Sequence, residues 1–171
     1  LRKAQEFAEK VHADLIIGFD IEGLMAVMKI RDKKGVWQEL TNSQQSSLIF
    51  GNLMHELENQ SSLPPKNRAF LLKPYVVTNM LKAIAKHYDI KTEELPLGFR
   101  HMAEFKRDIS RLFGDKEHIF FFLVDAYYGG SFIGYERDAI EIGFLATWVS
   151  ALAKSEGKTI FDSLNDIYLE T

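Results

Sequence analysis

Apolar residues in the first third of the chain fall alternately at helical and at strand-like spacing. A helix is predicted over residues 4–11, where apolar residues fall at i, i+3, i+4 and i+7. A second helix is predicted to begin at a cap formed by Asn42 or Ser43 and to end near Gln60. Between the two helices, short apolar runs predict strands at 15–17, 27–30 and 36–40.

The rest of the chain alternates strands with helices. Strands are predicted at 69–72, 91–95 and 119–124, and the last of these is expected in the centre of a sheet because it is wholly apolar. Helical spacing predicts one helix from Thr78, one over 99–113, one that follows the loop Asp125–Tyr135 and ends at Gly157, and one that begins at Thr159. This order predicts an α/β fold, a mixed sheet of about four strands flanked by helices in three layers.

An acidic loop follows the first predicted strand, Leu15–Ile17, which reads as buried. Asp20 and Glu22 stand on alternate residues of this loop, just before Gly23. Loops that leave the carboxyl ends of strands often carry the chemistry of α/β proteins. Two carboxylates placed in this way can converge on Mg²⁺, which prefers a few oxygen ligands together with water and phosphate. An acidic surface turn would show the same pattern.

Composition excludes several classes of function. A chain of 171 residues that is 46% apolar can bury the core of one domain with a piece of another attached. Its net charge of -3, without a basic block, argues against a nucleic-acid partner. The absence of cysteine excludes disulfides and cysteine-based zinc sites. No apolar run of about 18 residues is present, so we expect a cytoplasmic protein with no membrane partner.

Several catalytic motifs are incomplete in this sequence. His55 lacks a second histidine four residues later, because residue 59 is Asn, and zinc is therefore not expected. A G-x-S-x-G elbow around Ser131 fails at Ile133. Residues 17–23 are similar to the nucleophile motif of haloacid-dehalogenase-type phosphatases, but Glu22 replaces that family's second aspartate.

Five short motifs occur in order along the chain: ADLIIGFD at 13–20, ELTNSQ at 39–44, KPYVVT at 73–78, LGFR at 97–100, and RDAI through GKTIFDSL to IY at 137–168. This order resembles the central part of the α-D-phosphohexomutases, the phosphoglucomutase/phosphomannomutase family. The resemblance implies the third, sugar-recognition domain at 39–171, preceded at 1–38 by the end of the second domain with its magnesium loop. The chain also begins without Met and in helical register, as expected for a piece of a longer protein.

The resemblance also implies site residues. Asp20 and Glu22 would be the metal ligands, and two loops would bind substrate. The substrate-binding residues would be Gly98, Phe99, Arg100 and His101 in the first loop and Asp125 and Tyr127 in the second. Because both loops follow predicted strands, we expect them to face a common cleft. Arg100 would meet phosphate or sugar oxygens, Asp125 would accept hydrogen bonds from sugar hydroxyls, and Gly98 would let the backbone approach.

The sequence departs from the family pattern at several of these positions. Leu24 and Met25 replace the third aspartate and the arginine of the magnesium loop, so the Mg²⁺ of the parent family is expected to bind weakly or not at all. The sugar loop, usually G-E-E-S-G, reads LVDAYYG at 123–129 and has lost one acid and the hydroxyl. The phosphoserine motif T-A-S-H-N-P and the phosphate-clamp motif R-x-S-G-T-E-P are absent from the sequence.

Three functions remain open. The chain can be the central domain of a hexose-phosphate mutase that interconverts hexose 1-phosphate and 6-phosphate. Its partners would then be a hexose phosphate and the other domains of the same parent chain, and the chain alone would be inactive because it lacks the serine that carries the phosphoryl group. The second possibility is a degenerate, non-catalytic module that binds sugar phosphates or a protein. The third is a metal-dependent phosphatase. Whether the chain is itself an enzyme is therefore left open by the sequence.

Overall fold

The computed structural model describes residues 2–113, 119–132 and 137–170. In these ranges the helices are α1 Arg2–Lys10, α2 Asn42–Asn59, α3 Met80–His87, α4 Phe99–Phe113, α5 Ala139–Ser155 and α6 Ile160–Glu170. The strands are β1 Leu15–Phe19, β2 Ala26–Arg31, β3 Trp37–Glu39, β4 Ala69–Pro74, β5 Lys91–Leu95, β6 Phe120–Val124 and β7 Gly130–Ser131.

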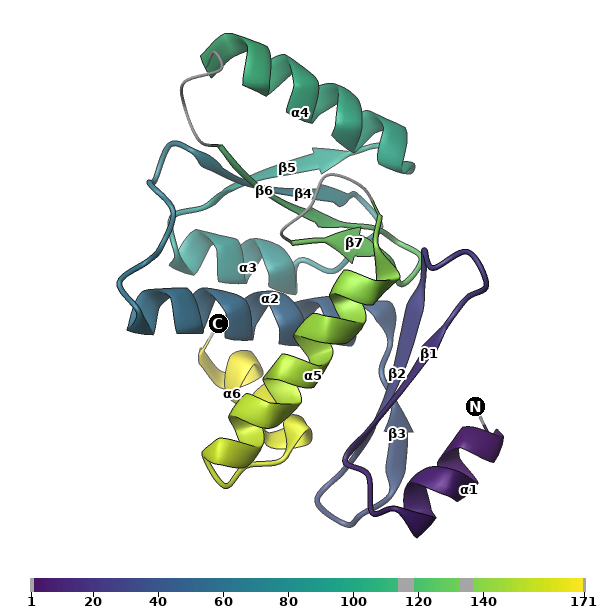
Figure 1. Ribbon diagram of the computed structural model, residues 1–171. Coiled ribbons are helices and arrows are strands. Elements are labelled where there is room, and N and C mark those ends of the chain that lie inside the picture. The colour runs from purple at the N-terminus through teal and green to yellow at the C-terminus, as the bar shows by residue number, and fades with distance from the viewer. Residues whose placement is uncertain (1, 114–118, 133–136, 171) are drawn as a thin grey trace.

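The strands form two sheets. A three-stranded antiparallel sheet has the order β1-β2-β3, and a four-stranded sheet has the order β5-β4-β6-β7. In the larger sheet β4 runs parallel to β5 and β6, whereas β7 is antiparallel to β6. Helix α4 covers one face of this sheet, and α2 and α3 cover the other (Figure 1). The predicted fold class, a mixed four-stranded α/β sheet in three layers, is confirmed.

Both faces of the larger sheet are covered at its two central strands, which explains why β4 and β6 are almost continuously apolar. Phe70 of β4 and Phe121 of β6 pack toward α4 with their rings 5.8 Å apart. Their neighbours Leu71 and Phe122 point to the opposite face, where the Phe122 ring lies 5.3 Å from Phe50 of α2. Each large side chain buried in this way contributes about 1.5–3 kcal/mol. The prediction that 119–124 forms a central strand is correct.

Local hydrogen bonds set the ends of the helices. The predicted cap of α2 at Asn42 or Ser43 is wrong: Thr41 is the N-cap, and its side chain accepts from the amide of Gln44 in a capping box. Thr78 accepts from the amide of Met80, so α3 begins two residues later than predicted. Asp138 caps α5, and Gly157 follows that helix with a φ of 72° that favours glycine, as expected.

The first predicted strand differs from its expected environment. We expected 15–17 to be buried as in a parallel sheet, but β1 pairs antiparallel with β2, and Ile16 is its one buried residue. The acidic loop is therefore the connection of a hairpin, with Phe19 opposite Ala26. One face of a small antiparallel sheet stays open to solvent, which is why β1 is half-exposed.

A second correction concerns the loop predicted over Asp125–Tyr135. Gly130 and Ser131 form the short strand β7 within it, next to Leu123 and Val124 of β6. A Cβ at Gly130 would lie 2.6 Å from the Leu123 carbonyl oxygen, so only a glycine permits this pairing. The end of the predicted loop, from 133 to 135, falls outside the described residues.

One hydrophobic core joins the two sheets. It contains Met28 and Ile30 from β2, Leu71 from β4, and apolar residues of α2, α5 and α6. The boundary predicted between residues 38 and 39 therefore lies within a continuous core and stays a prediction. None of the described helices combines the length and apolar character needed to cross a membrane.

Candidate functional site

Three loops meet at one edge of the four-stranded sheet. Because β4, β5 and β6 are parallel, their carboxyl ends lie together, with Pro74 opposite Leu95 and Leu72 opposite Leu123. We call this edge the rim; it consists of the loops 75–79, 96–98 and 125–129. The two loops predicted to bind substrate, at 98–101 and 125–129, both begin at this rim. Tyr75, Leu97 and Tyr127 are exposed there.

Asp125 lies at the end of β6 and is almost completely buried, with 1% of its side chain exposed. Its Oδ1 accepts a hydrogen bond of 2.6 Å from the amide of Ala126. Asn42, at the start of α2, ties both ends of the loop: its Nδ2 donates to the Asp125 carbonyl at 2.8 Å, and its Oδ1 accepts from the Tyr128 amide at 3.0 Å. These bonds hold Tyr128 at a φ of 55°. The loop is therefore fixed before any ligand binds.

Arg137 supplies the countercharge to Asp125. Its Nη2 forms an ion pair with Asp125 Oδ2, while 25% of the arginine side chain remains exposed. The guanidinium also lies over the ring of Phe99, 5.8 Å from its centroid, at the start of α4. One arginine thus contacts both of the loops that the sequence analysis proposed for the substrate.

The hairpin loop between β1 and β2 lies against the rim loop 125–129 and the start of α5. A Cβ on Gly129 would lie 2.7 Å from Cγ and Cδ of Arg137 and 2.8 Å from the Leu24 carbonyl oxygen. Arg137 and the hairpin loop therefore both pack closely against this glycine, and a larger residue would clash with them. The amide of Ala139 donates to Gly23 at 2.9 Å, and the amide of Ala26 donates to Tyr128 at 3.0 Å. Figure 1 shows the hairpin tip beside the start of α5.

The other predicted substrate residues point elsewhere or are unconstrained. Arg100 is 85% exposed and donates to Glu104 one helical turn away at 2.8 Å. This hydrogen bond lowers the pKa of Glu104. His101 also faces Glu104, at 3.8 Å. Gly98 has a φ of 120°, a conformation that a residue with a side chain rarely adopts. Tyr127 is exposed at the tip of its loop.

Lys73, at the end of β4, is a further charged group near the rim. It is fully buried, and its Nζ donates to the Val77 carbonyl at 3.0 Å and to Glu94 of β5 at 2.7 Å. Glu94 also accepts from Lys82 at 2.9 Å. The two lysines lower the pKa of Glu94 to about 2. Lys73 thereby fixes the turn that begins the loop 75–79.

Comparison with known proteins places this arrangement in context. No family model matches the chain. The chain is 26% identical over 166 residues to a phosphoglucomutase of Staphylococcus haemolyticus (strain JCSC1435), which covers 95% of this chain and 28% of that protein. It is 26% identical over 168 residues to a phosphoglucomutase of Staphylococcus aureus (strain N315), with coverage of 97% and 28%.

Solved structures agree in fold. A protein described as a phosphomannomutase from Thermus thermophilus superposes with a TM-score of 0.62 at 15% identity, over 98% of this chain and 34% of that one. An N-acetylglucosamine-phosphate mutase of the α-D-phosphohexomutase superfamily superposes with a TM-score of 0.59 at 11% identity, over 90% and 38%. The chain is thus similar in sequence to phosphoglucomutases and in fold to a member of the α-D-phosphohexomutase superfamily. The predicted resemblance is confirmed, and the chain spans about 28% of the length of the phosphoglucomutases it matches.

The hairpin loop, for which the resemblance predicts a magnesium site, does not fit a metal site of three carboxylates. Asp20 Oδ1 accepts from the amides of Leu24, at 2.7 Å, and Met25, at 2.9 Å, so it closes its own turn. Glu22 is exposed in the same turn. Within 2–113, 119–132 and 137–170, no three His, Cys, Asp or Glu side chains lie together in a way that could hold a metal ion. Asp20 and Glu22 as metal ligands stay a prediction.

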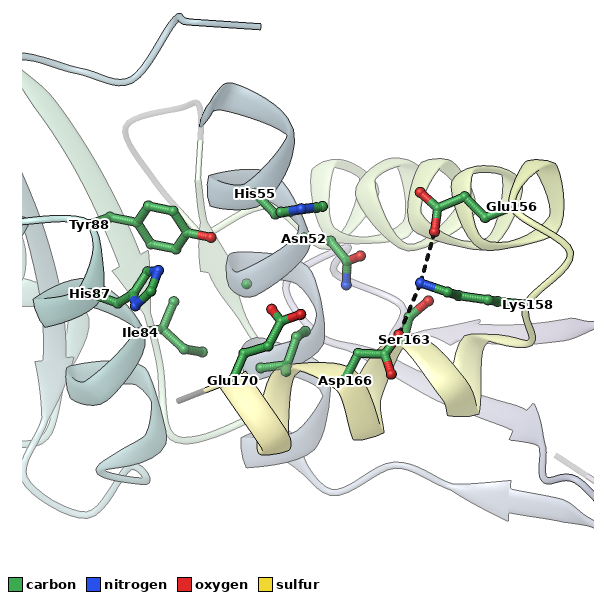
Figure 2. A pocket seen from close by; sticks show the side chains of 12 residues that line it. Asn52, His55, Ile84, His87, Tyr88, Glu156, Lys158, Ser163, Asp166 and Glu170 are labelled. Atoms are coloured by element: carbon green, nitrogen blue, oxygen red, sulfur yellow. Dashed lines mark ion pairs between the residues drawn. The ribbon is translucent and has the colours of Figure 1, made fainter. Parts of the chain in front are cut away.

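A separate hollow lies between α2, α3 and α6 (Figure 2), and no rim residue lines it. The hollow has a volume of about 610 Å³ and is open to solvent. His55, at its edge, lies about 20 Å along α2 from Asn42, at 1.5 Å per residue. Lys158 is the one lysine or arginine among the described residues that line it, and Glu156 and Asp166 each hold that lysine at 3.1 Å. None of the predicted site residues lines this hollow.

Sequence reasoning missed Arg137 and Asn42 as residues that contact the rim loop 125–129. Both stand inside motifs that carried the phosphohexomutase resemblance, RDAI and ELTNSQ, but neither motif indicates a contact with Asp125. The polar character of Arg137 and Asn42 indicated only that these side chains do something other than pack in the hydrophobic core. The partner could not be inferred, because Asn42 and Asp125 are 83 residues apart in sequence.

Proposed function

We propose that the rim is the sugar-phosphate binding site of a phosphohexomutase-like protein, whose reaction moves a phosphoryl group between the 1- and 6-oxygens of a hexose. The observation that carries this proposal is the convergence on Arg137 of Asp125, from the loop 125–129, and of Phe99, which directly follows the loop 96–98. Phosphoryl transfer in this class depends mainly on positioning and on neutralising charge, and a preformed rim of fixed loops supplies the positioning.

Within this proposal the chain contributes recognition. Residues 39–171 would form the sugar-recognition domain, and 1–38 would be the end of the preceding domain. The exposed side chains of Tyr75 and Tyr127 offer flat apolar surfaces to a sugar ring, and Arg137 offers N–H donors to its oxygens. No step is assigned to a metal, because the two carboxylates of the hairpin loop would hold one only weakly.

Binding is tested by an NMR titration of the 171-residue chain with glucose 1-phosphate and mannose 1-phosphate at millimolar concentration. We expect amide shifts concentrated in 97–101 and 125–129. The Arg107→Ala variant is the control and should show the same shifts as the wild type. This exposed arginine of α4 pairs only with Asp108 among the described residues. Shifts centred elsewhere, or no shifts in either loop, would remove the proposal.

Catalysis by this chain alone is not expected. The sequence contains neither the phosphoserine motif nor the phosphate-clamp motif, so no residue can carry the phosphoryl group between half-reactions. An assay that converts hexose 1-phosphate to 6-phosphate, with bisphosphate activator and Mg²⁺ supplied, should give the background rate. Reproducible turnover by pure protein would contradict the assignment of the chain as a recognition domain.

A second candidate function is a non-catalytic sugar-phosphate binding module. The observation that favours it is the hairpin loop, where Asp20 bonds its own backbone and Leu24 and Met25 stand in place of an acid and an arginine. Such a module should bind glucose 1-phosphate equally well with Mg²⁺ and with a chelator. A marked loss of affinity in the chelator would favour the mutase hypothesis instead.

A further inference from the structure

We infer that Arg137, rather than Asp125 or Arg100, is the residue through which the rim recognises its ligand, and that the group it recognises is a phosphate. The sugar part of this ligand rests on the proposed function; the phosphate contact does not. The resemblance implied that Asp125 of the loop 125–129 accepts hydrogen bonds from sugar hydroxyls. The inference instead assigns ligand recognition to a donor, Arg137.

The first step is that Asp125 has no free acceptor facing solvent. Its side chain is 1% exposed, Oδ1 accepts from Ala126, and Oδ2 is paired with Arg137 and is itself buried. To accept a hydroxyl, the carboxylate would have to give up one of these partners in a nearly dry environment. The aspartate is therefore placed to orient Arg137.

The second step is that Arg137 keeps donors available. A guanidinium carries five N–H groups, and among the described residues Asp125 is the one carboxylate paired with it. Among the described residues Nε is buried without an acceptor, whereas a quarter of the side chain is exposed. A planar guanidinium held at Nη2 by a carboxylate can present its other N–H groups to a ligand.

The third step is that the surroundings fix this orientation. Phe99 lies under the guanidinium, and Gly129 lets the arginine stem pass where any Cβ would collide with it. The neighbouring first turn of α4 contains no acidic residue that would repel an anion. A charge-assisted contact from a preorganised guanidinium favours an ionised acceptor over a hydroxyl, and phosphate oxygens match its geometry.

The experiment compares three probes by NMR titration and calorimetry: glucose 1-phosphate, inorganic phosphate and unphosphorylated glucose. We expect both phosphates to shift the amides of Phe99, Gly129 and Arg137, and glucose at the same concentration to leave them in place. Inorganic phosphate tests the anion contact, and the difference between it and glucose 1-phosphate measures what the sugar adds.

The variants separate Arg137 from Asp125. Arg137→Lys keeps the charge but loses the planar fork, and we expect phosphate affinity to fall about tenfold. The double variant Asp125→Asn with Arg137→Gln removes both charges, so that no buried charge is left alone, and it should lose phosphate binding. Asp125→Asn alone should keep phosphate affinity within about threefold, since the donor remains. Arg107→Gln is the matched control on an exposed arginine, and circular dichroism checks that each variant is folded.

The outcomes distinguish this inference from the proposed function. If glucose 1-phosphate shifts the rim but Asp125→Asn abolishes binding while Arg137→Lys does not weaken it, the inference is wrong and the proposed function stands. If inorganic phosphate binds through Arg137 but glucose 1-phosphate binds no more tightly, the inference stands without support for a sugar ligand. If Arg100→Gln abolishes phosphate binding and Arg137→Lys leaves it unchanged, the anion contact belongs to Arg100 and the inference is overturned.

Discussion

The hairpin loop at 20–25 and the rim loop at 125–129 each contain one aspartate for which the resemblance predicts a ligand role, but the two carboxylates have different partners. Asp20 accepts from Leu24 and Met25, four and five residues along the chain. Asp125 is paired with Arg137, and its loop is tied to Asn42 of α2. Asp20 therefore stabilises a local turn, whereas Asp125 joins segments that only the folded protein brings together.

This difference has consequences for ligand binding. A carboxylate that closes an exposed turn with its own backbone can be lost without disturbing the core, because its partners remain accessible to water. A buried carboxylate with a single countercharge cannot, since removal of the partner leaves an uncompensated charge in a low-dielectric site. The rim loop is thus the more rigid of the two and the better prepared to position a ligand.

The largest effect is expected from Arg137→Ala. Asp125 would then be a buried carboxylate without a countercharge, and we expect the free energy of unfolding to fall by about 3 kcal/mol. Urea unfolding followed by circular dichroism measures this change. The double variant Asp125→Asn with Arg137→Gln should recover most of the loss. If Arg137→Ala costs less than about 1 kcal/mol, in the range of an exposed ion pair, the two loops do not differ in the way described.

A second prediction extends the comparison to Lys73 of β4, whose carboxylate partner Glu94 is supplied by the neighbouring strand β5. The lysines hold the pKa of Glu94 at about 2, below its ordinary value of 4.5. Because the folded pKa is the lower one, the stabilisation is fully present above about pH 4.5 and is lost as pH falls toward 2.

Acid unfolding of the wild type and of Glu94→Gln measures this contribution. The variant should lose less stability than the wild type between pH 4.5 and 2, the window set by the two pKa values. Asp162, whose pKa is also lowered to about 2, chiefly by its hydrogen bond with Lys33, titrates in the same window and accounts for part of the slope that remains. Identical slopes in wild type and Glu94→Gln would show that the Lys73 pair is not coupled to folding.

Asp20→Ala should have a smaller effect. Two hydrogen bonds to backbone amides would be lost, but the turn is partly open to water, and we expect a loss of about 1 kcal/mol in the free energy of unfolding. Asp20→Asn keeps an acceptor at the same place and should be close to wild type. A loss as large as that of Arg137→Ala would mean that the hairpin loop also depends on tertiary contacts.

Most of the larger sheet could be predicted because its signals are local. The wholly apolar run at 120–124 predicts a strand and the helical spacing at 99–113 predicts a helix, without information from the rest of the chain. The structure contains both elements. The β1 to β2 hairpin was misjudged because a short branched run such as Leu15–Ile17 looks the same in a buried parallel strand and at the edge of a small antiparallel sheet. Strand β7 was missed because two residues are too few for a periodic signal.

The candidate site was only partly accessible to sequence reasoning for the same reason. Parallel strand order was enough to place the loops after β5 and β6 at one edge, since that follows from topology. The burial of Asp125 and its pairing with Arg137 depend on how the start of α5 lies against that edge. Sequence spacing contains no information about such a contact, and the resemblance indicated Arg100 alone as the cation.

The smallest effect is expected for Mg²⁺, which should bind the wild-type chain with an affinity no better than about millimolar. Asp20 Oδ1 already accepts from two backbone amides, and Glu22 is the one other acid of the loop, so a cation would gain few ligands and would compete with the turn. Calorimetric titration is the measurement, and micromolar affinity would contradict the comparison.

Leu24→Asp with Met25→Arg adds a carboxylate and the family's arginine, and it should strengthen Mg²⁺ binding if the hairpin loop corresponds to the magnesium loop. The same substitution should leave phosphate binding at Arg137 unchanged, because the two loops touch at Gly129 through the Leu24 carbonyl, which both versions retain.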